Sequence, residues 1–279
     1  MTSGPEDIQA RGGQHPDREH CSIDHDGVTV SVSRGGSGRP VVFCPGLYST
    51  QTGLQVLIDL LRRDHDVVTF DLGGHGLSSV APRYSFAGFL GDLSAVMEAV
   101  RIFDPAPVLV GYSLGADLVV HYASEHPGAV AGLVLIDGAN PIPEPFLPTA
   151  DVREFRAMWE NSVDAAADGA HRVLLTAEQV LELNLELDVI RTGPLLDRYR
   201  DIGVPVSMIM STAMAGAGAD ERTRWRNRNW RAGIDRLARA RPDITTTWLD
   251  ADHQLVLTHA TEIARKVADR VGRPPGPGD

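Results

Sequence analysis

The chain has 279 residues, of which 43% are hydrophobic, and it carries a formal net charge of −11. This length and composition suit a globular protein with a sizeable core, either one large α/β domain with an insertion or two small domains. The acidic balance argues against a nucleic-acid partner, because such proteins need basic surface to neutralise phosphates.

The number of cysteines and the pattern of apolar residues indicate the cellular compartment of the protein. The two cysteines, Cys21 and Cys44, cannot build a disulfide framework. Cys44 ends an apolar run, so we expect a buried, reduced thiol there. No apolar run approaches the length of a membrane span, and the N-terminus lacks the apolar core of a signal peptide. We therefore expect a cytoplasmic protein that does not associate with membranes.

Both ends of the sequence are polar and rich in glycine and proline. Residues 1–22 are predicted to form a disordered leader, and residues 273–279 a disordered tail. Four potential metal ligands gather near the leader, but their spacing matches no metal site: His15, His20, Cys21 and His25. We therefore expect no metal.

Between these ends, short apolar runs alternate with segments of helical periodicity. Residues 28–33 alternate apolar and polar side chains, as an edge strand does. The other predicted strands cover residues 40–43, 67–70, 107–110, 130–136, 204–210 and 245–249, and the predicted helices include 51–62, 85–103 and 116–124. This alternation predicts a parallel sheet covered by helices on both faces.

The segment around Ser113 is the strongest functional signal. A short apolar run is followed at once by Gly111-Tyr112-Ser113-Leu114-Gly115, and a helical segment comes next. This G-x-S-x-G pattern between a strand and a helix is typical of a nucleophilic serine on a tight turn. The alternative is a structural serine in a glycine-rich turn. We interpret Ser113 as a nucleophile.

Together with a second motif, this turn resembles the α/β-hydrolase superfamily over about residues 27–272. The second motif is Asp71-Leu72-Gly73-Gly74-His75-Gly76-Leu77-Ser78, which is similar to the superfamily's Asp-x-x-Gly-His-Gly-x-Ser turn. The resemblance implies a mostly parallel, doubly wound sheet formed by residues 23–140 and 201–272. It also implies a structural role for His75 rather than that of the base.

The superfamily's chain order of nucleophile, acid and histidine implies the partners of Ser113. His253 follows the last predicted strand, where the histidine belongs. In most members the acid follows the strand that corresponds to residues 204–210, but no carboxylate stands there. Asp137 ends the preceding strand, a placement that resembles some thioesterase domains and haloalkane dehalogenases. We favour Asp137 as the acid and keep Asp220 as the alternative.

The resemblance also implies an oxyanion hole. The loop after the strand at residues 40–43 would supply one backbone N–H, from Leu47, and Leu114 would supply the other. Cys44-Pro45 replaces the histidine that usually precedes the glycine at this loop. The resulting Cys-Pro-Gly turn is similar to that of thioesterases.

Residues 141–200 interrupt the α/β pattern with several prolines and then several predicted helices. The superfamily inserts lids at this point, so we expect a helical cap rather than an ordinary excursion. The residues expected to form its apolar underside are Phe146, Leu147, Phe155, Met158, Trp159 and Leu185. Beyond the cap, arginines crowd residues 222–231; they suit a solvated helix face better than a docking face for an anionic carrier.

The sequence therefore predicts a cofactor-free serine hydrolase that cleaves an ester or thioester through an acyl-enzyme at Ser113. The thioesterase-like features favour acyl release or transfer in biosynthesis, with a small-molecule or carrier-bound substrate. Two alternatives stay open. One is a cofactor-free lyase, cyclase or C–C hydrolase that uses the same triad, and the other is a non-catalytic ligand-binding protein.

Overall fold

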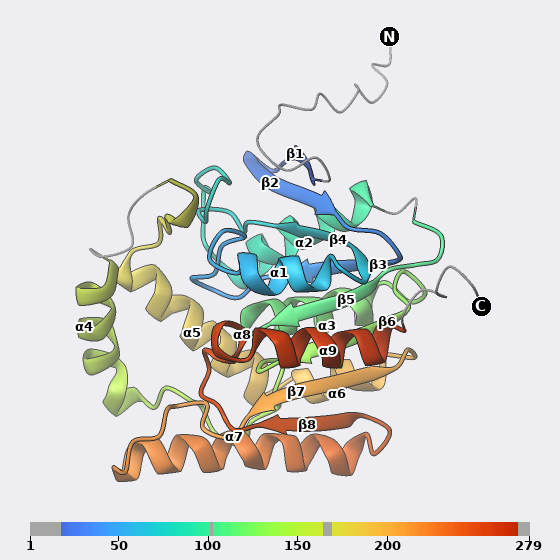
Figure 1. The fold of residues 1–279 in the computed structure, drawn as a ribbon. Coiled ribbons are helices and arrows are strands. Elements are labelled where there is room, and N and C mark those ends of the chain that lie inside the picture. The colour runs from blue at the N-terminus through green and yellow to red at the C-terminus, as the bar shows by residue number, and fades with distance from the viewer. Residues whose placement is uncertain (1–17, 101–102, 164–168, 273–279) are drawn as a thin grey trace.

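The computed structural model describes residues 18–100, 103–163 and 169–272. Its strands form one sheet in the order β1-β2-β4-β3-β5-β6-β7-β8 (Figure 1). In chain order the strands are β1 Arg18–His25, β2 Val28–Gly35, β3 Arg39–Cys44, β4 His65–Phe70, β5 Val108–Tyr112, β6 Gly132–Ile136, β7 Val206–Ser211 and β8 Thr245–Leu249. The pairs β1–β2 and β2–β4 are antiparallel and the other pairs are parallel, so the predicted mostly parallel sheet is confirmed.

Helices cover both faces of this sheet. The α-helices are α1 Gln55–Leu61, α2 Phe86–Ala99, α3 Leu114–Glu125, α4 Val152–Val163, α5 Ala177–Thr192, α6 Leu195–Arg200, α7 Glu221–Ala240, α8 Leu255–Thr258 and α9 Ala260–Val271. Helices α1, α8 and α9 close one apolar layer against β3, β5 and β6. Helices α2, α3, α5, α6 and α7 contribute to the larger layer on the other face. The doubly wound arrangement follows from these two cores.

Two expectations at the N-terminal side need correction. Residues 28–33 lie in β2, which is not the edge, because β1 pairs with it on the outside from Arg18↔Gly35 to His25↔Val28. Residues 18–22 are therefore strand rather than leader. Apolar side chains at Cys21 and Ile23 pack against the core, which gives β1 a reason to add to the sheet. The rest of the expected leader and the expected tail lie outside the described residues.

One predicted helix also ends early. Helix α2 begins after Ser85, whose side chain accepts a hydrogen bond from the Gly88 N–H, as an N-cap does. It ends at Ala99 rather than at residue 103. Helix α1 is likewise shorter than expected, beginning at Gln55. Differences of this size are expected when helix ends are located from sequence alone.

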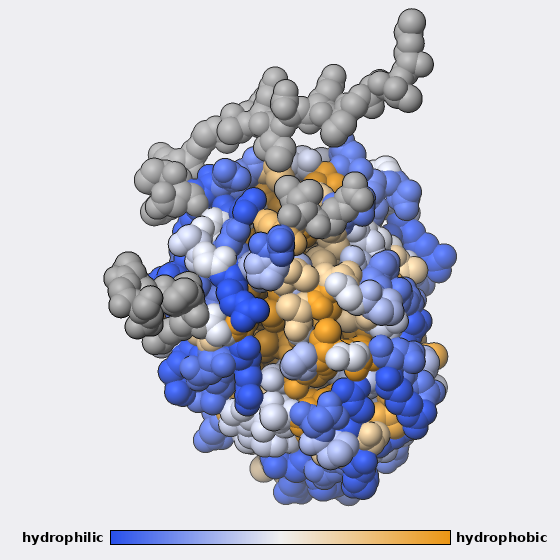
Figure 2. All heavy atoms as spheres, turned by 90° about the vertical axis from the view of Figure 1, so that its right-hand side faces the viewer, coloured by the Kyte–Doolittle hydropathy of each residue, from blue (hydrophilic) through white to orange (hydrophobic). Residues whose placement is uncertain are grey.

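The segment between β6 and β7 holds the helices α4, α5 and α6 and the short 3-10 turns Thr149–Asp151 and Gly169–His171. In Figure 1 α4 and the start of α5 lie beyond the end to which the arrows of β5 and β7 point. The carboxyl ends of the parallel strands, and with them Ser113, therefore lie on the side of α4 and α5. Figure 2 shows the opposite side of the molecule, where a band of apolar residues runs between hydrophilic margins.

Candidate active site

Ser113 occupies a sharp turn between β5 and α3. Its backbone has φ 51° and ψ −120°, in a region that residues with a side chain adopt only under constraint. The Ser113 N–H donates to the Ile136 carbonyl at 2.9 Å, and the Ser113 carbonyl accepts from the Ala116 N–H at 2.9 Å. These bonds fix the turn so that the serine leaves the strand at the start of the helix.

Two glycines allow other loops to pack against this turn. A Cβ on Gly115 would lie 2.2 Å from the Cys44 carbonyl oxygen, and one on Gly138 would lie 2.2 Å from the Ser113 carbonyl oxygen. No side chain fits at either distance. The loops after β3 and β6 therefore meet the Ser113 turn backbone to backbone.

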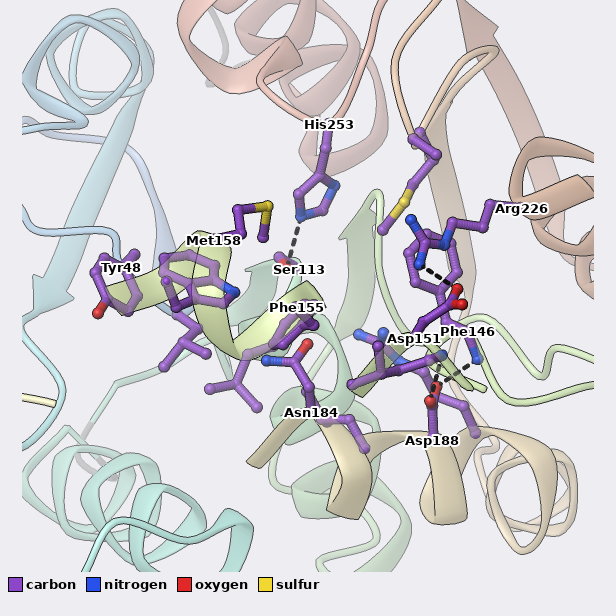
Figure 3. Close-up of a pocket in the computed structure, with 18 of the residues that line it drawn as sticks. Tyr48, Ser113, Phe146, Asp151, Phe155, Met158, Asn184, Asp188, Arg226 and His253 are labelled. Carbon is purple, nitrogen blue, oxygen red and sulfur yellow. Dashed lines mark hydrogen bonds and ion pairs between the residues drawn. The ribbon is translucent and has the colours of Figure 1, made fainter. Parts of the chain in front are cut away.

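His253 lies directly at the serine. It stands in the loop between β8 and α8, and its Nε2 is 2.9 Å from Ser113 Oγ (Figure 3). The Tyr112 hydroxyl donates to the His253 carbonyl at 2.7 Å, and the two rings lie 5.3 Å apart. Residues that are 140 positions apart are thus brought into hydrogen-bond contact, as the sequence predicted.

Asp137 completes the chain of hydrogen bonds. Its Oδ2 lies 2.8 Å from His253 Nδ1, and the carboxylate is fully buried. Ser211 donates to both oxygens, from its N–H to Oδ1 at 3.0 Å and from its hydroxyl to Oδ2 at 2.7 Å. The Trp230 indole N–H adds a bond to Oδ1 at 3.1 Å. The acceptors of this buried carboxylate are therefore well satisfied.

Asp220, the alternative acid, lies elsewhere and has another role. It is the N-cap of α7, where Oδ1 accepts from the Thr223 N–H at 2.8 Å and Oδ2 accepts from the Thr223 hydroxyl at 2.7 Å. These bonds lower the pKa of the Asp220 carboxyl. Asp220 therefore caps a helix. The carboxylate that contacts His253 is that of Asp137.

His75 is buried below the loop that contains Leu47. Its Nδ1 lies 3.0 Å from the Gly73 carbonyl, and its Nε2 accepts from the Tyr48 N–H at 3.3 Å. Complete burial lowers the pKa of His75 to about 4, so the ring is neutral near pH 7. The neutral ring with a proton on Nδ1 matches both contacts. His75 thus connects two turns and does not contact Ser113.

The two candidate oxyanion donors stand beside the serine. Leu47 and Leu114 both line the cavity that contains Ser113 and His253. The Leu47 N–H donates to no other described residue. Leu114 is the first residue of α3, where N–H groups lack an acceptor within the helix.

The cavity has a volume of about 420 Å³ and reaches to both sides of Ser113. In Figure 3, Tyr48 and Met158 lie on one side of the serine, and Asp151, Asp188 and Arg226 lie on the other. Of the expected apolar residues, Phe146, Leu147, Phe155, Met158 and Trp159 line it, whereas Leu185 is 38% exposed and does not. Sequence reasoning missed Asn184, Leu187, Asp188 and Arg191 on the same helix as Leu185.

The first side is aromatic and apolar. The Trp159 ring from α4 packs against Tyr48 at a tilt of 40°, with centroids 4.5 Å apart, and the Phe155 ring lies 6.1 Å from Trp159. This cluster joins the segment between β6 and β7 to the loop after β3. We call it the apolar lobe of the cavity, with Leu47 and Met158 as its other members.

The second side is polar, and we call it the polar lobe: Phe146, Asp151, Asp188, Arg191 and Arg226. Asp188 accepts from the Phe146 N–H at 2.8 Å and the Leu147 N–H at 2.7 Å. Burial raises the pKa of Asp188 above its ordinary value, although the two backbone donors oppose this shift. Arg226 forms an ion pair with Asp151 at 2.9 Å. Two of the crowded arginines, Arg222 and Arg226, thus face the cavity rather than solvent alone.

Comparison with known proteins identifies the family. Residues 39–190 match the family described as the alpha/beta hydrolase fold. The chain belongs to this family.

Several curated members of the alpha/beta hydrolase family are recognisably related in sequence. A putative non-heme haloperoxidase of Mycobacterium phage D29 is 27% identical over 210 residues, which cover 66% of this chain and 74% of that protein. A serine hydrolase-like protein of Danio rerio is 31% identical over 115 residues, covering 40% of this chain and 33% of the relative. Esterase YbfF of Escherichia coli is 31% identical over 101 residues, covering 36% and 39%. The last two matches span well under half of those relatives.

Solved structures agree with the assignment of the fold. The crystal structure of E-2-(acetamidomethylene)succinate hydrolase has a TM-score of 0.67 at 21% identity, covering 90% of this chain and 98% of that chain. The thioesterase domain from the curacin biosynthetic pathway has a TM-score of 0.65 at 19% identity, covering 90% and 99%. At these identities the likeness shows the fold, while the curated relatives support a hydrolase enzyme.

The described residues contain neither a cluster of metal ligands nor a helix suited to a membrane. Across this part of the chain, no group of three or more His, Cys, Asp or Glu side chains could hold a metal ion. His25 instead lies 2.6 Å from Asp92, and His15 is outside the described residues. None of the helices in the described segments has the length and apolar character needed to cross a membrane.

Proposed function

We propose that the protein is a serine hydrolase that cleaves an ester or thioester through an acyl-enzyme at Ser113. The observation that supports this most strongly is the hydrogen-bonded chain from Ser113 through His253 to the buried carboxylate of Asp137. A serine hydroxyl needs an adjacent base to act as a nucleophile, and that base needs a group that orients it.

In the proposed first step, Ser113 Oγ attacks the substrate carbonyl carbon while its proton passes to His253 Nε2. The C–O bond forms, and the carbonyl electron pair moves to the oxygen. The tetrahedral intermediate then collapses: the bond to the alcohol or thiol breaks, and His253 returns the proton to this leaving group. Asp137 holds the imidazole orientation through Nδ1 and stabilises the imidazolium between the two transfers.

The second half of the reaction repeats these transfers with water. His253 takes a proton from a water molecule, whose oxygen attacks the acyl carbon of the Ser113 ester. The intermediate releases the carboxylic acid, and the proton returns to Ser113 Oγ. In both halves the free N–H groups of Leu47 and Leu114 would bind the oxyanion, and each donor of this kind contributes on the order of 10²–10³ in rate.

The segment 141–200 would act as the cap of this site. Phe155, Met158 and Trp159 come from its helix α4, and Asn184 and Leu187 come from α5. Side chains from these helices line the cavity together with Ser113, so a bound substrate would be enclosed between the sheet end and the cap. Exclusion of water strengthens the electrostatic contacts within such a site.

Pre-steady-state kinetics with p-nitrophenyl butyrate test the proposal. We expect a burst of about one nitrophenolate per enzyme, since an acyl-enzyme accumulates when deacylation is slower. Ser113→Ala should abolish the burst and lower kcat/KM by at least about 10³. Unchanged turnover in Ser113→Ala would refute the proposal. Binding of the ester without any release of nitrophenolate would favour the ligand-binding alternative.

A further inference from the structure

The polar lobe holds a buried arginine with an unused donor. Arg191 is only 7% exposed, although it lines the cavity. Its guanidinium donates to Asp117 twice, from Nε at 3.1 Å and from Nη2 at 2.5 Å. Its third nitrogen, Nη1, donates to no residue in the described segments. The pair with Asp117 fixes the guanidinium plane, and a substrate atom in the cavity could accept from Nη1.

Arg226 has a second unused donor. Its Nη2 binds Asp151 at 2.9 Å, whereas its Nε is buried and has no hydrogen-bond partner. The guanidinium also lies 5.5 Å above the Phe146 ring, which fixes its position. A buried N–H without an acceptor is unfavourable, and an acceptor supplied by a ligand would relieve this.

These two arginines face the same part of the cavity. Arg191 and Arg226 both lower the pKa of Asp188 by their charge, so both lie close to its carboxylate. The Arg191 guanidinium lies 5.7 Å from the Trp230 ring, and Trp230 lies 6.2 Å from Phe146, which is the ring below Arg226. The carboxylate oxygens of Asp188 already accept from backbone N–H groups.

Charge decides between a neutral and an anionic acceptor. The ionisable groups of the polar lobe and their ion-pair partners are of both signs. The positive groups are Arg191, Arg222 and Arg226, and the negative groups are Asp117, Asp151, Glu154 and Asp188. The carboxylates outnumber the arginines, so an added negative charge would be repelled overall. A guanidinium can only donate hydrogen bonds. The lobe therefore suits an uncharged oxygen that accepts them.

We propose that the substrate carries a neutral carbonyl oxygen, of a ketone or an amide, on the arm that lies in the polar lobe, where Arg191 and Arg226 bind it. The other arm, in the apolar lobe, is hydrocarbon. This inference rests on the proposed function and names its substrate class: an ester or thioester with one apolar arm and one arm that bears an uncharged carbonyl group.

Two matched substrate pairs test this on the acyl arm and the leaving-group arm. The acyl pair is p-nitrophenyl pentanoate and p-nitrophenyl 4-oxopentanoate. The leaving-group pair is the S-pentyl and S-(2-acetamidoethyl) thioesters of butyrate. Each kcat/KM is divided by the rate of alkaline hydrolysis, which removes differences in intrinsic reactivity. In one pair we expect the carbonyl-bearing member to be preferred by about tenfold or more. The hydrogen glutarate ester, which carries a carboxylate, should show no such preference.

Arg222 offers a matched control for Arg226, because both form ion pairs with Asp151. We expect Arg226→Gln to abolish the preference ratio and Arg222→Gln to keep it. Arg191 is replaced together with its buried partner Asp117, in the double variant Arg191→Met with Asp117→Leu, because a single replacement would leave an unpaired buried charge. This double variant should also lose the preference. A ratio near one in the wild type, or an equal ratio in Arg226→Gln and Arg222→Gln, would overturn the proposal.

Failure of the proposed function can be separated from failure of this inference. If none of the esters is turned over, the proposed function is wrong, and calorimetry with S-pentyl and S-(2-acetamidoethyl) thioethers of butane then decides the subsite. About tenfold tighter binding of the acetamide-bearing thioether, lost in Arg226→Gln, would support it. Equal binding of the two thioethers would overturn it.

Discussion

The Ser211 hydroxyl donates to Asp137 Oδ2 at 2.7 Å, and the Ser211 N–H donates to Oδ1 at 3.0 Å. Ser211 is the last residue of β7, and Asp137 directly follows the neighbouring strand β6. The end of β7 is where most members of the superfamily carry the acid. Here a serine occupies that end and donates to a carboxylate that follows the neighbouring strand β6.

The assignment of the acid is tested by comparing Asp137→Asn with Asp220→Asn. We expect Asp137→Asn to lower kcat/KM by about 10⁴, because the amide cannot hold the required tautomer of His253. Asp220→Asn should leave kcat/KM unchanged, because asparagine also caps a helix. The measurement is steady-state hydrolysis of p-nitrophenyl butyrate. A large loss in Asp220→Asn with none in Asp137→Asn would reassign the acid.

Ser211 and Trp230 donate hydrogen bonds to the Asp137 carboxylate, and we expect them to position it. Ser211→Ala and Trp230→Phe each remove one donor to it, and each should lower kcat about tenfold with little change in KM. Ser207→Ala, on the same strand, is the control, since the Ser207 hydroxyl forms an exposed hydrogen bond with the Thr245 hydroxyl. Equal kcat values for Ser211→Ala and Ser207→Ala would contradict the role assigned to Ser211.

The close approach of the chain at the Ser113 turn predicts a steric effect. Gly115→Ala would place a methyl group 2.2 Å from the Cys44 carbonyl, so we expect the free energy of unfolding to fall by about 1–3 kcal/mol and activity to drop with it. Gly203→Ala is the matched control, because no atom lies within 4 Å of its Cβ position. Urea denaturation measures both variants, and equal stability would mean that the turn tolerates a side chain.

His75 predicts a pH dependence of stability. Its pKa is about 4 in the folded protein and near the ordinary 6.5 in the unfolded chain. The unfolded chain therefore binds the proton first as the pH falls, and the folded state loses stability between about pH 6.5 and 4. The loss should reach ~3 kcal/mol. Urea denaturation of wild type and His75→Asn over this range isolates the effect, which the variant should lack. Parallel curves for the two proteins would contradict it.

The sequence predicted the parts of the site that depend on local pattern and on the order of strands. Ser113 could be found because its motif lies between a strand and a helix, and His253 and Asp137 because each follows a strand of a parallel sheet. Carboxyl ends of parallel strands meet at one edge, so their positions along the chain imply their positions in space.

Residues that lie on helices and contact the candidate site could not be predicted in this way. Trp230 lies 93 residues after Asp137, on a helix that the arginine pattern made look solvated. The same pattern does not show that Arg222 and Arg226 line the cavity while the other arginines of residues 222–231 do not. Which face of a helix meets the site depends on tertiary packing, and no local spacing records it. The strand β1 was missed because its side chains are polar and only two of its positions pack against the core.

A nucleophilic serine at position 113 that depends on the imidazole of His253 should react covalently with a fluorophosphonate. Mass spectrometry of the labelled, digested protein should show one adduct, on the peptide that contains Ser113. Ser113→Ala should show none, and His253→Ala should label at least about 100-fold more slowly. Labelling of a different residue, or labelling of His253→Ala at the wild-type rate, would show that Ser113 is not a nucleophile activated by His253.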